Sequence, residues 1–293
     1  MNYVIVTPCK NEEKNLQSLA DSIINQTLKP KLWLIIDDGS TDNTPIILNN
    51  LINNHGWICV ITGIRSQRDL SFHYAEIVSI AIKETYQICN KQNIIFDYIG
   101  LIDADMILSQ NFFEKIVYKF EKNPNLGVAS GSDATRKGNI IIIEKDRDNL
   151  PNGGLRVWRR KCYEDTGGFP RSYSADAVSN VLAILHGWET RKFVDIICIQ
   201  TRKTSSSEGL WKGFKTRGES DYYRDYHPFY VFFKFIKYVI SHPYYTGIAY
   251  IYSYIYCVLK SKEKIELIEV RKYYRKKHKE IIRYYGKKFK SRL

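Results

Sequence analysis

The sequence lacks several features that would assign it to a class at once. Its six cysteines are scattered without a Cys-x-x-Cys pair, so neither a zinc site nor a disulfide framework is indicated. No basic segment followed by a long apolar segment stands near Met1, so we expect no secretory signal. The loop Thr7–Asn11 is not glycine-rich, which argues against a nucleotidyltransferase with a phosphate-cradling loop. These absences favour an unprocessed chain in a reducing, cytoplasmic setting.

The chain has 293 residues, with 44% apolar and 14% aromatic side chains, enough for one catalytic-size domain and an appendage. Its net formal charge of +13 is concentrated at one end. Residues 260–293 hold fourteen Lys and Arg against four Glu, a net +10, which leaves +3 for the first 259 residues. Such a tail suits an anionic membrane surface, a nucleic acid or simply solvent.

The order of the apolar runs predicts the fold class. Runs that read as buried strands alternate with patterns that read as helices: strands at Tyr3–Thr7, Lys31–Ile36 and Trp57–Ile61, helices at Leu16–Gln26 and Thr44–Asn54. This alternation is typical of a doubly wound α/β sheet, whose ligands bind beyond the carboxyl ends of the strands. Polar residues follow Val6, Ile36 and Ile102, so we expect them together at that edge.

Two acids interrupt a later apolar run, in the stretch Leu101–Leu108. In a strand, Asp103 and Asp105 project from the same face because side chains alternate with a period of two. Their mutual repulsion and burial are costly unless a cation neutralises them, which indicates a divalent metal carrying an anionic ligand such as a nucleotide diphosphate. The alternative is structural: Asp103 ends the strand and Asp105 caps a helix that begins near Gln110.

Three ordered motifs resemble the family 2 glycosyltransferases. They are Val6-Thr7-Pro8-Cys9-Lys10-Asn11-Glu12, Asp37-Asp38-Gly39-Ser40-Thr41-Asp42 and Asp103-Ala104-Asp105. The resemblance continues through Asn152–Arg160, Gly167-Gly168-Phe169 and Ser174-Ala175-Asp176. It implies a GT-A-like mixed sheet with helices on both faces, a nucleotide-sugar donor, Mn²⁺ or Mg²⁺, and transfer with inversion at the anomeric carbon.

The resemblance also implies roles for individual residues. Asp38 would contact the base, Asp103 the ribose or base edge, and Asp105 the metal on the diphosphate. Thr7 and Pro8 would line the nucleotide pocket. Arg65 or Arg68 would reach the base or a phosphate, although an arginine in such a loop is otherwise a solvated charge.

Asp176 is the candidate general base, because the family base commonly lies in a Glu-Asp pair before a helix. This sequence departs from that pattern with Ala175 in place of Glu. In the structural alternative, Asp176 stabilises the helix dipole by under ~1 kcal/mol. Gly153 and Gly154 would permit positive φ and a close backbone approach beside the sugar and acceptor, or would form only a turn.

We expect a catalytic domain at 1–205, a mobile loop or lid at 206–220 that contains Trp211 and Arg217, and a helical, aromatic and basic region at 221–293. Residues 238–259 contain no Asp, Glu, Lys or Arg. His242, Pro243 and frequent tyrosines favour two helices lying on a membrane over a spanning helix. The alternative is packing on the catalytic domain or in a homodimer. The pattern from Lys260 to Leu293 predicts a long amphipathic helix with a basic face.

These observations predict an inverting, metal-dependent glycosyltransferase at the inner face of the cell membrane. Its donor would be a nucleotide-diphosphate sugar, with UDP favoured, and its acceptor a lipid-linked sugar or growing glycan. One alternative is a nucleic-acid-binding protein that uses the basic tail, which we do not favour. Another is an inactive scaffold of the same fold, against which the presence of four acids argues: Asp38, Asp103, Asp105 and Asp176.

Overall fold

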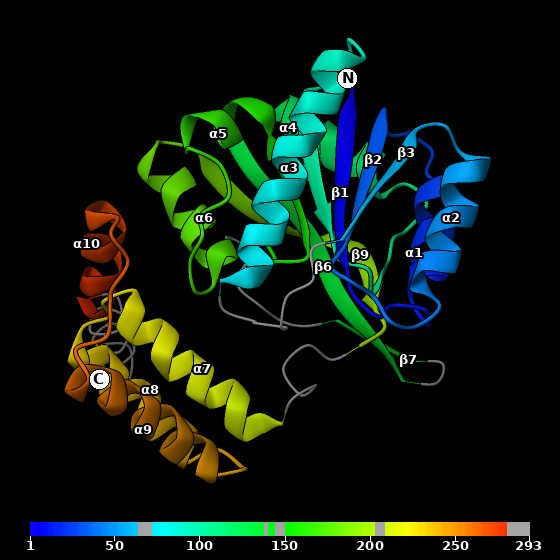
Figure 1. Ribbon diagram of the computed structural model, residues 1–293. Coiled ribbons are helices and arrows are strands. Elements are labelled where there is room, and N and C mark those ends of the chain that lie inside the picture. Colours follow the sequence, from blue (N-terminus) through cyan, green and yellow to red (C-terminus); the bar gives the residue numbers. More distant parts are fainter. Residues whose placement is uncertain (64–71, 138–139, 144–149, 203–208, 280–293) are drawn as a thin grey trace. The chain divides into compact units, whose positions relative to one another are not determined.

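The computed structural model describes residues 1–63, 72–137, 140–143, 150–202 and 209–279 (Figure 1). Arg65 and Arg68 therefore lie outside the described residues. The chain forms two compact units. The first comprises Met1–Arg171 and Ala175–Arg202, and the second comprises Ser172–Ser174 and Lys203–Leu293.

The first unit is built on a nine-stranded mixed sheet. Its strands are β1 (Tyr3–Cys9), β2 (Leu32–Asp37), β3 (Ile58–Thr62), β4 (Tyr98–Ile102), β5 (Met106–Ile107), β6 (Leu126–Lys137), β7 (Ile140–Ile143), β8 (Leu155–Arg159) and β9 (Glu189–Gln200). They follow the order β3-β2-β1-β4-β8-β6-β9-β5, with β7 paired to β6. Strands β1 to β4 are mutually parallel, whereas β8 is antiparallel to both of its neighbours. The predicted mixed α/β fold is confirmed.

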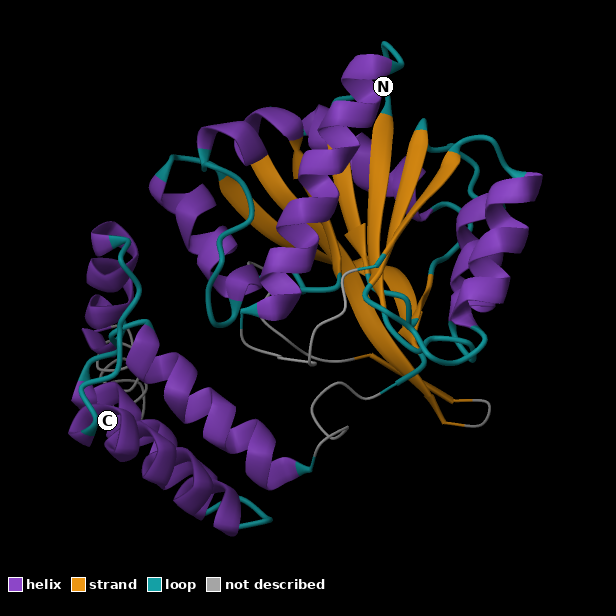
Figure 2. Ribbon diagram, in the orientation of Figure 1, coloured by secondary structure: helices purple, strands orange, loops and turns teal. Residues whose placement is uncertain are grey.

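Helices cover both faces of this sheet (Figure 2). On one face lie α1 (Leu16–Ile24), α2 (Thr44–Asn54) and α4 (Phe112–Lys122); on the other lie α3 (His73–Lys91), α5 (Arg160–Asp165) and α6 (Ala175–Leu185). Strand β1 serves both layers, since Tyr3 and Ile5 pack into the first and Val4 and Val6 into the second. Each large apolar side chain buried in this way contributes about 1.5–3 kcal/mol, which fixes the strand register.

The second unit contains α7 (Leu210–Tyr223), α8 (Pro228–Val239), α9 (Tyr245–Leu259) and α10 (Ile268–Lys276). The break between α8 and α9 falls at His242 and Pro243, as expected. The loop expected over 206–220 is wrong from Leu210 onward, because that segment is helix α7. Gly218 in this helix serves packing, because a Cβ there would lie 2.2 Å from the carbonyl oxygen of Tyr250 in α9.

The long helix expected from Lys260 is also wrong in its first part, since α10 begins only at Ile268. The intervening chain turns back, because the amide of Ile265 donates to the carbonyl oxygen of Tyr223 at 2.9 Å and the Ile265 side chain is buried. A buried carboxylate stabilises this return. Asp225 accepts from Lys264 Nζ at 2.5 Å and from Arg275 Nη1 at 3.0 Å.

A second buried acid, Asp221 in α7, joins the remaining helices of this unit. Its carboxylate accepts from Tyr250 Oη of α9 and from Lys234 Nζ of α8, both at 2.7 Å. Arg224 Nη2 adds a third contact at 3.1 Å. A buried charge is tolerated only when it is paired in this way, so the network fixes how α7, α8 and α9 pack together.

Candidate active site

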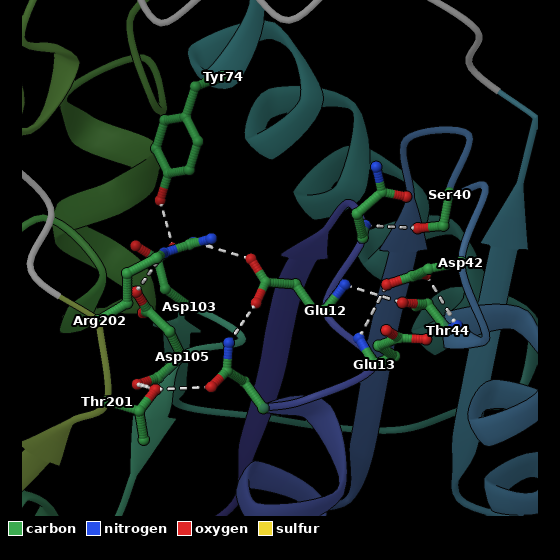
Figure 3. Close-up of polar contacts among 12 residues, drawn as sticks. Glu12, Glu13, Ser40, Asp42, Thr44, Tyr74, Asp103, Asp105, Thr201 and Arg202 are labelled. Atoms are coloured by element: carbon green, nitrogen blue, oxygen red, sulfur yellow. Dashed lines mark hydrogen bonds and ion pairs between the residues drawn. The ribbon is translucent and has the colours of Figure 1, made fainter. Parts of the chain in front are cut away.

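The loops that follow β1 and β2 are tied together at the carboxyl edge of the sheet (Figure 3). The amide of Asn11 donates to Ser40 Oγ at 2.9 Å, and Asn11 Oδ1 accepts from the amide of Thr41 at 2.8 Å. The amide of Glu12 donates to Thr44 Oγ1 at 2.8 Å. These bonds hold the first two motifs of the sequence side by side.

Asp38 lies at this edge and is 6% exposed, and its carboxylate is paired with two basic side chains. Asp38 Oδ2 lies 3.2 Å from Lys10 Nζ and 2.9 Å from His73 Nε2. No sequence motif singled out His73, which enters the site because α3 begins there. That Asp38 contacts the base of the donor nucleotide stays a prediction.

Thr7 and Pro8 lie in β1, just before the loop. Thr7 is fully buried, and its Oγ1 accepts from Trp33 Nε1 at 2.9 Å. Its side chain therefore serves the packing of β1 against β2. Pro8 is half-buried in the same strand. That these two residues line the nucleotide pocket stays a prediction.

The two acids after β4 meet a third, Glu12, in an acidic pocket that we define as Glu12, Asp103 and Asp105 (Figure 3). Glu12 and Asp105 are only 5% and 3% exposed. Arg202 enters the acidic pocket: its Nη2 donates to Glu12 Oε1 at 2.8 Å, and its Nε lies 3.4 Å from Asp105 Oδ2. Tyr74 Oη donates to Asp103 Oδ1 at 2.6 Å.

The electrostatics of the acidic pocket follow from its low exposure. Burial, with further contributions from Asp105 and Glu12, raises the pKa of Asp103 to about 7 although the Tyr74 hydrogen bond lowers it. Burial and the charge of Asp103 hold the pKa of Tyr74 well above its ordinary value. Asp103 therefore resists ionisation, and a further positive charge beside it would be favourable.

The acidic pocket fits a hard cation. Asp105 Oδ1 is buried and has no hydrogen-bond partner among the described residues, and such an oxygen is a ligand that Mg²⁺ and Mn²⁺ prefer. Within the described part of the chain, no three His, Cys, Asp or Glu side chains are arranged to hold a metal by themselves. Phosphate oxygens and water would then complete the coordination, as is usual for Mg²⁺. The alternative that Asp105 caps the next helix is wrong, because α4 begins at Phe112 with Asn111 as its N-cap.

Gly153 and Gly154 pass beside two carboxylates. A Cβ on Gly154 would lie 1.8 Å from Asp103 Oδ2, and one on Gly153 would lie 3.4 Å from Asp176 Oδ2. The carbonyl oxygen of Gly154 also accepts from the amide of Asp103 at 2.8 Å. The turn thus comes close to two carboxylates of the chain itself, while its approach to the sugar and acceptor stays a prediction. Neither glycine adopts a positive φ.

Asp176 lies in the first turn of α6, half-buried, so the helix dipole stabilises its charge as the structural alternative requires. Beneath it, Arg156 is fully buried and donates to the carbonyl oxygens of Asn152, Pro151 and Asp176 at 3.0, 3.1 and 3.3 Å. Arg156 therefore ties the Gly153-Gly154 turn to the start of α6. Arg156 lies in the stretch Asn152–Arg160 that carries the family resemblance, yet nothing in the sequence indicated this structural role.

Solved structures share this architecture. The crystal structure of S. aureus TarS residues 1–349 in complex with UDP aligns with a TM-score of 0.54 at 14% identity, over 75% of this chain and 65% of that chain. The mannosyltransferase PcManGT from Pyrobaculum calidifontis, in complex with GDP-Man and Mn²⁺, aligns with a TM-score of 0.55 at 16% identity, over 87% and 69%. The first unit thus has a GT-A fold.

The sequence profile described as glycosyl transferase family 2 matches residues 4–179. The chain belongs to that family and is a glycosyltransferase. Poly-beta-1,6-N-acetyl-D-glucosamine synthases from Staphylococcus epidermidis and Staphylococcus aureus are 25% identical to it over 134 residues, which make up 46% of this chain and 29% of each relative. The match therefore covers less than a third of the length of these curated relatives.

Proposed function

We propose that this glycosyltransferase moves a sugar from a nucleoside diphosphate sugar, with UDP the favoured nucleotide, to a hydroxyl of a lipid-linked sugar or growing glycan. The reaction depends on Mn²⁺ or Mg²⁺ and inverts the anomeric carbon. One observation carries the proposal: the carbonyl oxygen of Gly154 accepts from the amide of Asp103 in the acidic pocket at 2.8 Å, while a Cβ on Gly153 would lie 3.4 Å from Asp176 Oδ2. Donor and acceptor groups can therefore meet across a single backbone turn.

The donor side rests on Asp105 and Asp38. A cation held by Asp105 would neutralise the charge that develops on the departing diphosphate. Asp38, buried beside Lys10 and His73, offers an acceptor group for the base. TarS with UDP or UDP-GlcNAc and PcManGT with GDP-Man support a nucleotide-sugar donor for this fold.

The acceptor side rests on Asp176. The acceptor hydroxyl oxygen attacks the anomeric carbon, the bond from that carbon to the diphosphate oxygen breaks, and the diphosphate leaves with the electron pair. Asp176 takes the proton of the hydroxyl. Attack opposite to the leaving group inverts the configuration, and Arg156 holds the backbone of Asp176 in register with the Gly153-Gly154 turn.

The second unit supports a membrane-linked acceptor. Helices α8 and α9 each carry an exposed apolar stripe at intervals of three and four residues: Phe229, Phe232, Phe233, Ile236 and Ile240, then Tyr245, Ile248, Tyr252, Ile255, Tyr256 and Leu259. We refer to these side chains as the apolar stripes. Residues 228–259 contain no Asp or Glu, and net +10 follows in residues 260–293. Exposed apolar side chains beside positive charge complement an anionic bilayer surface, here the inner face of the cell membrane.

The described helices do not include one that is both long and apolar enough to cross a bilayer. Membrane binding is tested by sedimentation with phosphatidylglycerol-containing and pure phosphatidylcholine vesicles. We expect binding to the anionic vesicles, and its loss when Phe232, Ile236, Ile248 and Tyr252 are changed to Ser. The matched control changes Ile46 and Ile95, which are 59% and 74% exposed on the first unit, to Ser. A stripe variant that loses self-association in light scattering yet keeps vesicle binding would assign the face to a second copy instead.

The transfer reaction is tested by release of nucleoside diphosphate from a panel of UDP- and GDP-sugars. We expect release with one donor, dependent on Mn²⁺ or Mg²⁺ and lost in Asp105→Asn. Asp165→Asn is the matched control, because this acid ends α5 and pairs with Lys161 away from the acidic pocket. Release from every donor at the rate of a protein-free sample would reject the proposal.

A further inference from the structure

Arg202 contacts two members of the acidic pocket. Its Nη2 and Nε approach Glu12 Oε1 at 2.8 Å and Asp105 Oδ2 at 3.4 Å. The two side chains that it pairs with are 6% and 3% exposed, whereas that of Arg202 is 38% exposed. Arg202 therefore reaches the acidic pocket from its solvent side and supplies positive charge to acids that are otherwise buried.

The backbone beside Arg202 is fixed. The amide of Thr201 donates to the carbonyl oxygen of Asp105 at 2.9 Å, and Thr201 Oγ1 contacts that oxygen and Asn15 Oδ1 at 3.0 and 2.8 Å. Pairing of Met106 with Gln200 continues this anchor between β5 and β9. A change of partner would then involve the long side chain of Arg202 and not its backbone. An arginine side chain has several rotatable bonds and therefore many rotamers.

Asp105 has one carboxylate oxygen toward Arg202, and the other, Oδ1, is buried with no hydrogen-bond partner in the described part of the chain. A divalent cation on this carboxylate would repel a guanidinium that lies so near, since like charges at a few ångströms oppose each other strongly in a poorly solvated site. A diphosphate brought by the nucleotide offers Arg202 a new anionic partner, and a guanidinium binds phosphate with two parallel hydrogen bonds.

We propose that Arg202 occupies the acidic pocket as a counter-ion until the donor arrives, and then moves to the diphosphate as the divalent cation binds Asp105. This inference rests on the proposed function. It makes the free protein a poor binder of the metal alone and makes nucleotide and metal binding mutually dependent, because a coupling between two ligands acts equally on both. The metal is then taken up together with the donor.

The experiment measures Mn²⁺ binding from the electron paramagnetic resonance signal of free Mn²⁺, first without nucleotide. Arg202→Gln removes the counter-ion, so it binds Mn²⁺ alone about tenfold more tightly than the wild type. With saturating Mn²⁺, calorimetry measures UDP binding, and here the substitution has the opposite effect on affinity. Arg202→Gln binds UDP about tenfold more weakly than the wild type. Arg202→Lys keeps the positive charge, so its Mn²⁺ affinity without nucleotide stays near that of the wild type.

The control is Arg160→Gln, which removes an exposed arginine paired with Glu164 in α5 and leaves both affinities unchanged. If Arg202 had a purely structural role, Arg202→Gln would bind both Mn²⁺ and UDP more weakly. That result, or an unchanged Mn²⁺ affinity, would overturn the inference. The proposed function fails separately, when the wild type binds no nucleotide with Mn²⁺ and Asp105→Asn behaves like the wild type.

Discussion

The guanidinium of Arg156 donates a hydrogen bond to the backbone carbonyl oxygen of Asp176 at 3.3 Å, although the two residues are separated by 20 positions in the chain. The same group bonds the carbonyl oxygens that precede the Gly153-Gly154 turn. One buried cation therefore sets the position of the candidate base relative to the turn that contacts the acidic pocket. This relationship makes Arg156 a positioning residue for transfer.

Arg156→Lys replaces a five-donor fork by a single ammonium and leaves buried carbonyl oxygens without donors. We expect a loss of about 2–4 kcal/mol in unfolding free energy by urea titration, and a fall in kcat with little change in donor KM. Arg159→Lys is the control, since Arg159 bonds the carbonyl oxygens of Phe120, Asn123 and Leu126 instead. It should lose stability but keep kcat, and equal kcat losses in both variants would argue against positioning.

The two glycines of the turn predict different sensitivities. Gly154→Ala forces a Cβ to within 1.8 Å of Asp103 Oδ2, so the turn or the carboxylate must shift by more than an ångström. A displacement of that size costs about a hundredfold in kcat/KM. Gly153→Ala meets Asp176 only at 3.4 Å, an ordinary contact, and should lose far less. Steady-state kinetics of the two variants measures this difference in kcat/KM. A Gly153→Ala variant as impaired as Gly154→Ala would contradict this geometry.

Asp176→Asn removes the proton acceptor and keeps the size of the side chain. We expect donor binding by calorimetry to stay at the wild-type value, while transfer falls by about 10²–10⁴-fold. The first turn of α6 loses one favourable charge, so stability should change by under ~1 kcal/mol. If the variant loses donor binding, Asp176 serves the nucleotide and another group accepts the proton.

A pH dependence is expected in the second unit. Burial alone would raise the pKa of Asp225, but hydrogen bonds and charges from Lys264 and Arg275 outweigh it and hold that pKa below its ordinary value. A carboxyl with a lowered pKa in the folded state stabilises fully above its unfolded pKa, and this stability is lost as the pH falls through the folded value. Asp225→Asn should therefore cost about 1.5–3 kcal/mol at neutral pH, and the difference should shrink below about pH 4. Thermal unfolding of both proteins across this range measures it, and a pH-independent difference would count against the ion pairs.

The sequence was sufficient for the sheet and for the acids that follow its strands. The parallel pairing of β1 with β2 and β4 brings the three polar loops to one edge. The strand alternation expected for Asp103 and Asp105 is wrong, because β4 ends at Ile102 and the two acids lie in a turn, in which the amide of Met106 donates to the carbonyl oxygen of Asp103 at 3.2 Å. Arg202 could not be found this way. It stands 190 positions from Glu12, and only the pairing of β5 with β9 brings it to the acidic pocket.

Local composition predicted the wrong secondary structure in two segments whose conformation depends on tertiary packing. The composition of 206–220 suggested a loop, yet Gly218 in this segment gives α7 its close approach to α9. The apolar pattern after Lys260 suggested one helix, but burial of Ile265 and the bonds to Asp225 turn the chain before α10. These features depend on partners far along the chain, which no local pattern contains.

The most direct test of the account is the melting temperature of the protein with UDP, with and without Mn²⁺, in the wild type and in Asp105→Asn. A ligand that binds only the folded state raises the melting temperature. We expect an upward shift that needs UDP and Mn²⁺ together and disappears in Asp105→Asn. An equal shift in both proteins, or a shift with UDP that Mn²⁺ does not increase, would reject a metal-dependent donor site at Asp105.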